Sequence, residues 1–223
     1  MKAMDGIFAV YKPKGMTSHD VVDRVRRITG ERSVGHAGTL DPLAEGVLVL
    51  GIGDATKDLQ KVVEKDKEYF VRIKLGEEST TDDAEGEKRM VFAREIPTSD
   101  KIAALVEKFK GKIKQTPPLY SAVKVEGKES YKWARRGEPK ELKPREVEIK
   151  DIEVIMYDWP NLSLKVVTGP GFYVRSLARD IGKELKPGGY VQELFRTRVG
   201  VYTDKEAIRL EEFPEFWKSR TLS

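Results

Sequence analysis

The segment from Gly35 to Leu48 brings together residue types that could carry chemistry. It reads GHAGTLDPLAEGVL, so two glycines flank a histidine and Asp41 precedes a proline. Glycine lets a backbone approach a ligand closely, and proline stiffens the turn. An aspartate held in such a turn could serve as a catalytic carboxylate. An isolated Asp-Pro more often only caps a turn, with its carboxylate on a nearby backbone N–H.

The composition excludes several other chemistries. The sequence of 223 residues contains no cysteine, which rules out disulfides, thiolate metal sites and a cysteine nucleophile. Uracil C5-methyltransferases that use a cysteine nucleophile are therefore excluded. Only His19 and His36 could supply imidazole, so we expect no conventional zinc site.

Charge and hydropathy place the chain in a broad class. Lys and Arg number 41 against 37 Asp and Glu, a net charge of +4, and charged residues make up 35% of the chain. On composition alone, a well-solvated surface explains these numbers better than nucleic-acid binding. No window approaches the ~20 apolar residues of a membrane span. Together with the absence of cysteine, this predicts a cytoplasmic protein that does not contact a membrane.

The residues around the Asp41 segment show the patterns of strands and a helix. Residues 6–11 (GIFAVY) form a short apolar run typical of a buried strand. Thr17 or Ser18 then predicts the start of a helix that Gly30 ends. After this helix we expect, in order, a loop at 32–42, a buried strand at 46–52 and a half-buried strand at 67–75.

The remaining elements suggest the fold class. In order, we expect an acidic loop at 77–87, a helix from Thr98 to Gly111, a small basic helix at 131–136, strands at 147–157 and 162–168, a helix at about 172–185 and a strand at about 194–202. Strands outnumber helices without a strict βαβ alternation. This favours an α+β protein with a mixed, mainly antiparallel sheet flanked by helices.

The Gly35–Leu48 string closely resembles the motif around the catalytic aspartate of the TruB family of pseudouridine synthases. The resemblance continues in family order through residues 12–18, 53–57, 67–69, 117–122 and 171–176, and so covers nearly the whole chain. It implies the pseudouridine synthase fold in one catalytic domain over residues 1–223. It also implies an isomerisation that needs no cofactor and no metal. Most bacterial relatives carry a further RNA-binding domain of the PUA type, which we expect to be missing here.

The resemblance also implies residue roles. Asp41 would attack either the ribose C1′ or the uracil C6, and Arg175 would pair with its carboxylate. Tyr69 would stack on the uracil and help to remove the C5 proton. The residues that would line the substrate pocket are His36, Lys57, Tyr173 and Leu194. Without the motif, Tyr69 would equally be a core aromatic, Arg175 a surface arginine and His36 a loop histidine of no consequence.

The target base must leave its stack in the RNA, which costs a few kcal/mol and requires a grip on the backbone. The candidate grips are Arg24, Arg27, Lys132, Arg135, Arg136 and Arg196. Each basic cluster alone is more often a solvated face than an RNA contact. The region at about 115–145 resembles the family's insertion that closes over the RNA loop. The implied partner is the T-arm of tRNA, with position 55 as the target, bound by a monomer with no obligatory protein partner.

Two other functions stay open. The first is a guide-RNA-dependent relative of the dyskerin type, which works inside a multi-protein particle and whose members need the PUA domain. The second is an RNA chaperone that binds and remodels tRNA without chemistry. The joint presence of Asp41, Tyr69 and Arg175 argues for retained catalysis.

Overall fold

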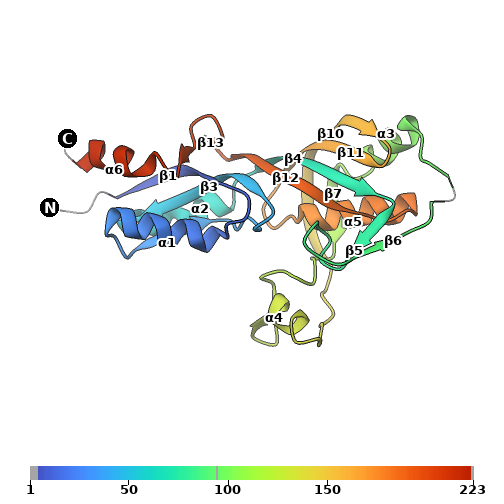
Figure 1. Cartoon of the computed structure of the whole chain (residues 1–223), viewed down its shortest axis with the longest axis horizontal. Coiled ribbons are helices and arrows are strands. Elements are labelled where there is room, and N and C mark those ends of the chain that lie inside the picture. Colours follow the sequence, from blue (N-terminus) through green and yellow to red (C-terminus); the bar gives the residue numbers. More distant parts are fainter. Residues whose placement is uncertain (1–4, 94, 222–223) are drawn as a thin grey trace. The chain divides into compact units, whose positions relative to one another are not determined.

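The structure is a computed structural model that describes residues 5–93 and 95–221 (Figure 1). The chain divides into two compact units. The first contains residues up to Tyr69 and from Leu194 onward, and the second contains Phe70–Glu193. The chain leaves the first unit inside strand β4 (Lys67–Leu75) and returns to it inside strand β12 (Gly189–Val199), so both strands contribute to both units.

The first unit is built on strands in the order β14-β1-β3-β12. Its elements besides β4 and β12 are β1 (Gly6–Lys12), α1 (Ser18–Thr29), β2 (Val34–Ala37), β3 (Glu45–Ile52), the 3-10 helix η1 (Gly53–Asp58), α2 (Leu59–Val63), β13 (Tyr202–Thr203), β14 (Ile208–Arg209) and α6 (Phe213–Thr221). Strands β1 and β2 are both antiparallel to β3, whereas β12 is parallel to β3. Strand β3 thus pairs with three other strands and is the central strand of this unit.

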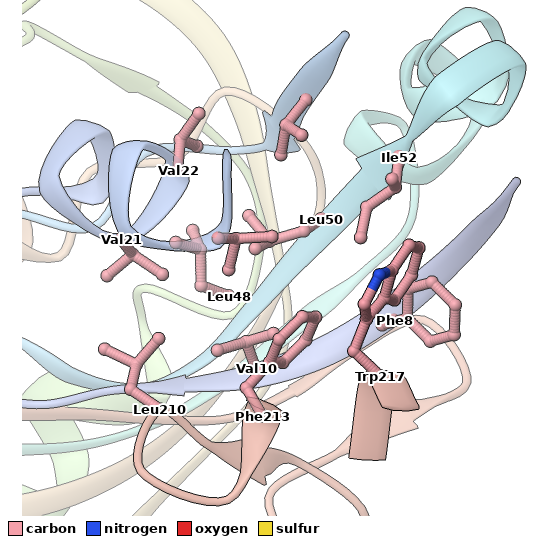
Figure 2. Packing of buried hydrophobic residues seen from close by; sticks show 12 residues of the cluster. Phe8, Val10, Val21, Val22, Leu48, Leu50, Ile52, Leu210, Phe213 and Trp217 are labelled. Carbon is pink, nitrogen blue, oxygen red and sulfur yellow. The ribbon is translucent and has the colours of Figure 1, made fainter. Parts of the chain in front are cut away.

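Both faces of β3 are buried, which explains its continuous apolar run. Leu48 and Leu50 point to one face, where they join residues of α1 and α6 such as Val21 and Phe213 (Figure 2). The alternate residues of β3 point to the opposite face and join Leu59 of α2. Side chains of a strand alternate between faces, so a strand covered on both sides shows no polar alternation. The predicted buried strand is confirmed.

Helix α1 begins and ends as the sequence predicts. The Thr17 hydroxyl accepts a hydrogen bond from the Asp20 N–H at 3.0 Å, and the Asp20 carboxylate accepts one from the Thr17 N–H at 2.8 Å. This reciprocal pair satisfies two N–H groups at the helix start. Gly30 ends the helix at a φ of 70°, a conformation that favours glycine. The expectation of a loop at 32–42 is wrong for Val34–Ala37, because this stretch pairs with β3 as β2.

The second unit continues the sheet through β4-β11-β10-β7. Its elements besides β4 and β12 are β5 (Glu77–Ser79), β6 (Lys88–Met90), α3 (Ser99–Glu107), β7 (Gly111–Gln115), β8 (Lys124–Val125), β9 (Lys128–Glu129), α4 (Ser130–Ala134), β10 (Arg145–Asp158), β11 (Asn161–Thr168) and α5 (Val174–Leu185). Strand β10 is antiparallel to both β11 and β7. The sheet of the described residues has ten strands and is mixed but mainly antiparallel, so the predicted fold class is confirmed.

Most predicted elements of the second unit are confirmed, with shifted boundaries. Strand β12 begins at Gly189 and ends at Val199, earlier at both ends than expected. The acidic stretch 77–87 contains the short strand β5 in addition to loop residues. Strand β7 was not predicted, because its sequence GKIKQ contains a single strongly apolar residue. The expectations of one catalytic domain over 1–223 and of an RNA-contacting insertion at 115–145 stay predictions.

Candidate active site

Asp41 lies in the connection between β2 and β3, residues 38–44, which we call the Asp41 turn. A hydrogen bond from the Ala44 N–H to the Asp41 carbonyl, at 3.0 Å, closes the turn. Ser18 at the start of α1 fastens it, because its hydroxyl accepts from the Leu40 N–H at 2.9 Å and donates to the Leu40 carbonyl at 3.0 Å. Asp41 is half-buried. These hydrogen bonds therefore fix the backbone position from which the Asp41 side chain extends.

Lys12, at the end of β1, anchors the same turn from the other side. Its side chain is 0% exposed, and its ammonium group donates to the carbonyls of Met16, Pro13 and Pro42 at 2.7, 3.0 and 3.5 Å. The Pro42 carbonyl also accepts from the Gly15 N–H at 2.7 Å. One ammonium group thus joins the loop after β1 to the Asp41 turn. No role was predicted for Lys12, although a lysine directly after an apolar strand was a signal that the sequence offered.

Tyr69 and Arg196 come from different strands, β4 and β12, and both side chains are buried, with 7% and 1% exposure. Tyr69 is a hydrogen-bond partner of the Arg196 guanidinium, and the carboxylate of Asp41 attracts the same group. Burial lowers the pKa of Arg196, and these two partners oppose the shift. The first unit therefore brings Asp41 and Tyr69 to one shared cation.

His36 lies on β2 opposite Leu50 of β3 and is half-buried. Burial lowers the pKa of His36, and the nearby charges of Arg196 and His19 lower it further. The imidazole is therefore neutral at physiological pH. Within the described part of the chain, its buried Nδ1 has no hydrogen-bond partner. A neutral imidazole with an unused nitrogen can form one more hydrogen bond when a ligand reaches it.

The two other predicted pocket residues of the first unit differ in exposure. Lys57 is exposed on η1, and its ammonium group pairs with Asp54. This hydrogen bond raises the pKa of Lys57. Leu194 is buried on β12, two residues before Arg196. Their role in lining a substrate pocket stays a prediction.

Arg175 lies in the first turn of α5 in the second unit and is 5% exposed. Its guanidinium donates to the carbonyls of Tyr120 and Thr81 at 2.9 and 3.1 Å, and it lies 3.5 Å from a carboxylate oxygen of Asp83. A buried arginine needs such partners. The alternative of an ordinary surface arginine is therefore wrong, whereas the pairing of Arg175 with Asp41 stays a prediction. Asp83 was missed, because one more carboxylate in an acidic stretch carries no signal.

The backbone of Tyr173 is held at the start of α5. Its N–H donates to the side-chain oxygen of Gln115 at 2.9 Å, and its carbonyl accepts from the side-chain nitrogen of Gln115 at 3.1 Å. Gln115 is the last residue of β7, so this two-way contact joins strand and helix. It fixes the direction in which α5 presents Arg175, two residues later.

Five of the six predicted RNA-binding residues are exposed. Arg24 and Arg27 lie on the exposed face of α1, and Lys132, Arg135 and Arg136 lie on or after α4. In the α4 segment, which we define as residues 128–140, Lys132 and Arg135 lie 5.8 and 5.3 Å from the ring centre of Tyr131. The sixth residue is a correction: Arg196 is buried, and its donors point to the protein's own carbonyl groups. It cannot grip RNA from the surface.

Residues 5–93 and 95–221 contain neither a membrane-spanning helix nor a cluster of metal ligands. No described helix is long and apolar enough to cross a membrane. Among the same residues, no group of three or more histidine, aspartate or glutamate side chains could hold a metal ion. The candidate site of the first unit consists of the Asp41 carboxylate, the Tyr69 phenol and the Arg196 guanidinium.

Family models match nearly the whole chain. Residues 26–174 match the N-terminal domain of the TruB family pseudouridylate synthases, and residues 175–222 match the C-terminal domain of tRNA pseudouridylate synthase B. The tRNA pseudouridine synthase B of Thermobifida fusca is 47% identical over 218 residues, which cover 93% of this chain and 74% of that protein. The protein of the same name from Caldanaerobacter subterraneus is 44% identical over 216 residues, which cover 96% of this chain and 75% of that protein.

Two solved structures have a similar fold. A chain in the crystal structure of a Cbf5–Nop10–Gar1 complex superposes with a TM-score of 0.75 at 31% identity, over 98% of this chain and 57% of that chain. A chain in the structure of an H/ACA RNP bound to a substrate RNA superposes with a TM-score of 0.72 at 27% identity, over 98% and 56%. The present chain thus spans a little over half the length of these two chains. The family models and the relatives show that the chain belongs to the TruB family of pseudouridylate synthases, which are isomerases.

Proposed function

We propose that this protein isomerises the T-loop uridine at position 55 of tRNA to pseudouridine, with Asp41 as the catalytic carboxylate. The relatives named tRNA pseudouridine synthase B support tRNA as the substrate. One structural observation carries the assignment of the site. Asp41 and Tyr69, which are far apart in the sequence, both interact with the buried guanidinium of Arg196. A carboxylate and a phenol are thereby available at one place in the first unit.

The reaction exchanges one glycosidic bond for another. Asp41 attacks either the ribose C1′ or the uracil C6, the N1–C1′ bond breaks, and the uracil turns before a C5–C1′ bond forms. The bond between Asp41 and C1′ or C6 breaks again, so the free carboxylate is restored. The proton on C5 is lost, with Tyr69 placed to help remove it, and N1 gains a proton. Substrate and product contain the same atoms, so the reaction requires no cofactor, no metal and no redox partner. In this proposal Arg175 pairs with the carboxylate of Asp41, which keeps it charged and directed.

The uridine has to leave its stack before any of these steps. Extrusion of a base costs a few kcal/mol, which contacts with the RNA backbone must offset. The exposure of Arg24 and Arg27 and of the basic residues of the α4 segment supports their use as this grip. The extruded nucleotide then contacts His36, Lys57, Tyr173 and Leu194. The partner is the T-arm of tRNA, and the protein acts in the cytoplasm as a monomer that needs no other protein.

Site-resolved mapping of pseudouridine tests the proposal. The purified protein is incubated with an unmodified tRNA transcript, without guide RNA or a second protein, and Asp41→Asn is treated in parallel. Product at position 55 with the wild-type protein only is the expected result, because the asparagine keeps the shape of the side chain but lacks the carboxylate. Full activity of Asp41→Asn would overturn the mechanism. Tight tRNA binding with no product at any position would favour an RNA chaperone instead.

A guide-RNA-dependent synthase is the second candidate function. The 31% identity and TM-score of 0.75 to a chain of a Cbf5–Nop10–Gar1 complex favour it. The relatives named tRNA pseudouridine synthase B are more similar, at 47% and 44% identity, and weigh against it. The same experiment separates the two functions, because a guide-dependent synthase leaves free tRNA unmodified. Modification of free tRNA by the wild-type protein alone excludes the guide-dependent function as a requirement.

A further inference from the structure

Arg196 is a buried charged residue that has no role in the reaction proposed above. It lies on β12 in parallel register with Gly46 of β3 and is 1% exposed. The two strands approach closely at this point, because a Cβ atom on Gly46 would lie 2.2 Å from the Arg196 carbonyl oxygen. Burial of a guanidinium is costly unless its N–H groups find acceptors. The groups that accept hydrogen bonds from Arg196 therefore indicate its role.

Two of these acceptors lie on either side of Asp41. The Arg196 Nε donates to the Val47 carbonyl at 2.8 Å, and one terminal nitrogen donates to the Gly38 carbonyl at 3.0 Å. Gly38 is the first residue of the Asp41 turn, and Val47 lies on β3 just after it. A single rigid side chain thus joins both ends of the segment that carries Asp41. A planar guanidinium fixes its acceptors at set directions, which a point charge cannot do.

The other two partners are the residues proposed to carry out the chemistry. Tyr69 is a hydrogen-bond partner of Arg196, and Asp41 attracts it through its charge. Because arginine has donors only, the Tyr69 oxygen must be the acceptor of this bond. The bond leaves the phenol O–H free to point away from the guanidinium. Arg196 therefore touches the backbone that places the carboxylate as well as the oxygen of the phenol.

We propose that Arg196 is a positioning residue, which holds the Asp41 turn and the Tyr69 hydroxyl in one fixed arrangement for the isomerisation. This inference rests on the proposed function, since it assumes that Asp41 and Tyr69 act on the uridine. A displacement of about 1 Å at reacting groups can cost about 100-fold in rate. Lysine keeps the charge of Arg196 but lacks the planar fork that reaches two carbonyl groups and a phenol together.

The charge of Arg196 acts on two neighbouring basic groups, Lys67 and His36. Burial and then the charge of Arg196 lower the pKa of Lys67 to about 8. The pKa of His36 is lowered by burial first and by Arg196 second. The four titratable groups that interact with Arg196 are thus Asp41, Tyr69, His36 and Lys67. At neutral pH the imidazole of His36 carries no charge, whereas Lys67 keeps most of its charge, and the carboxylate of Asp41 favours the charged form of Arg196.

The test compares Arg196→Lys with Arg198→Lys in the full chain. Arg198 lies two residues further along β12 and donates to the Gly200 carbonyl at 3.1 Å, so it is a matched control outside the site. We expect Arg196→Lys to lower the single-turnover rate at saturating enzyme by roughly 10- to 100-fold, with the Kd for tRNA changed by less than about 3-fold. Arg198→Lys should keep the wild-type rate. Equal rates for both variants, or a loss confined to Kd, would overturn the proposal.

A double-mutant cycle with Tyr69→Phe separates positioning from general loss of structure. If Arg196 acts through the phenol oxygen, Arg196→Lys costs at least about 5-fold less in the Tyr69→Phe background than in the wild type. Independent, multiplicative effects would overturn the link to Tyr69. If Arg196→Lys does not fold, Arg196→Gln takes its place with the same expected loss. A wild-type protein without product would defeat the proposed function itself, which is a different outcome from an active wild type and an unaffected Arg196 variant.

Discussion

The Asp41 turn and the α4 segment both depend on basic side chains, in opposite ways. Lys12 and Arg196 are buried beside the turn, and their N–H groups donate to backbone carbonyls. In the α4 segment the ammonium groups of Lys128 and Lys140 lie over the ring of Trp133, 5.0 and 4.8 Å from its centre. Lys128 is exposed, and Lys140 is half-buried and pairs with Glu126. Buried cations fix a backbone in place, whereas exposed cations over aromatic rings stay available to phosphate.

The largest expected effect tests the buried cations. Replacement of Lys12 by methionine removes a donor from three carbonyl groups, of which that of Pro42 keeps the Gly15 N–H. Each buried acceptor left unpaired costs about 1–3 kcal/mol. We expect Lys12→Met to lower the free energy of unfolding by about 3 kcal/mol, measured by guanidinium chloride denaturation. Lys14→Met is the matched control, because Lys14 is exposed in the adjacent turn and should change stability by less than about 0.5 kcal/mol. Equal free energies of unfolding for Lys12→Met and Lys14→Met would show that burial of the cation does not stabilise the Asp41 turn.

The second prediction concerns the exposed cations. Substitution of Lys132, Arg135 and Arg136 by alanine should weaken tRNA binding by roughly 10- to 100-fold and lower the slope of log Kd against log salt by about 2. The single-turnover rate at saturating enzyme should not change, because none of these side chains fixes the Asp41 turn. Filter binding at several salt concentrations measures the slope. Alanine at Lys110, Lys112 and Lys114 removes the same charge from another surface, and an equal loss there would show that net charge alone matters.

The smallest effect comes from a third buried cation, Lys67, which donates to the carbonyls of Val63 and Lys65. Burial lowers its pKa from 10.5 to about 8. The unfolded chain therefore holds more protons between these two values, and stability should rise as pH increases through this window. The two carbonyl acceptors favour the ammonium form of Lys67. They reduce the expected increase in the free energy of unfolding to about 1 kcal/mol. Lys67→Met should abolish the rise in denaturation curves at pH 7.5 to 10.5, and parallel curves for both proteins would contradict this account.

The spacing of apolar residues along the sequence predicted most of the fold. Strands β1, β3 and β4 and helix α1 follow from apolar runs, alternation and caps that a single sequence displays. Strand β2 was missed because the residues around His36 are glycine-rich and their apolar character is weak. What makes them a strand is pairing with β3, a non-local contact that no local pattern reports.

The residues that hold the candidate site in place were not predicted. Asp41, Tyr69 and Arg175 were identified through a resemblance to a family, whereas Lys12 and Asp83 had no assigned role and Arg196 was assigned to the surface. The error has one physical cause. Basic and acidic residues are rarely buried, so a single sequence favours exposure for each of them. Burial becomes apparent only when the carbonyl groups that satisfy them are brought together by the fold.

The aromatic content of the two regions gives each of them its own optical signal. Trp217 of α6 lies in the core of the first unit, with its ring 6.3 Å from that of Phe213 and nearly parallel to it, at 13°. Trp133 lies in the basic α4 segment, where its indole N–H donates to the Val125 carbonyl at 3.1 Å. Fluorescence of Trp217 therefore reports whether the first unit is folded, and that of Trp133 reports events at the α4 segment. The chain contains a third tryptophan, Trp159. Variants that keep either Trp133 or Trp217 as the single indole make docking of RNA and melting of the core separately visible.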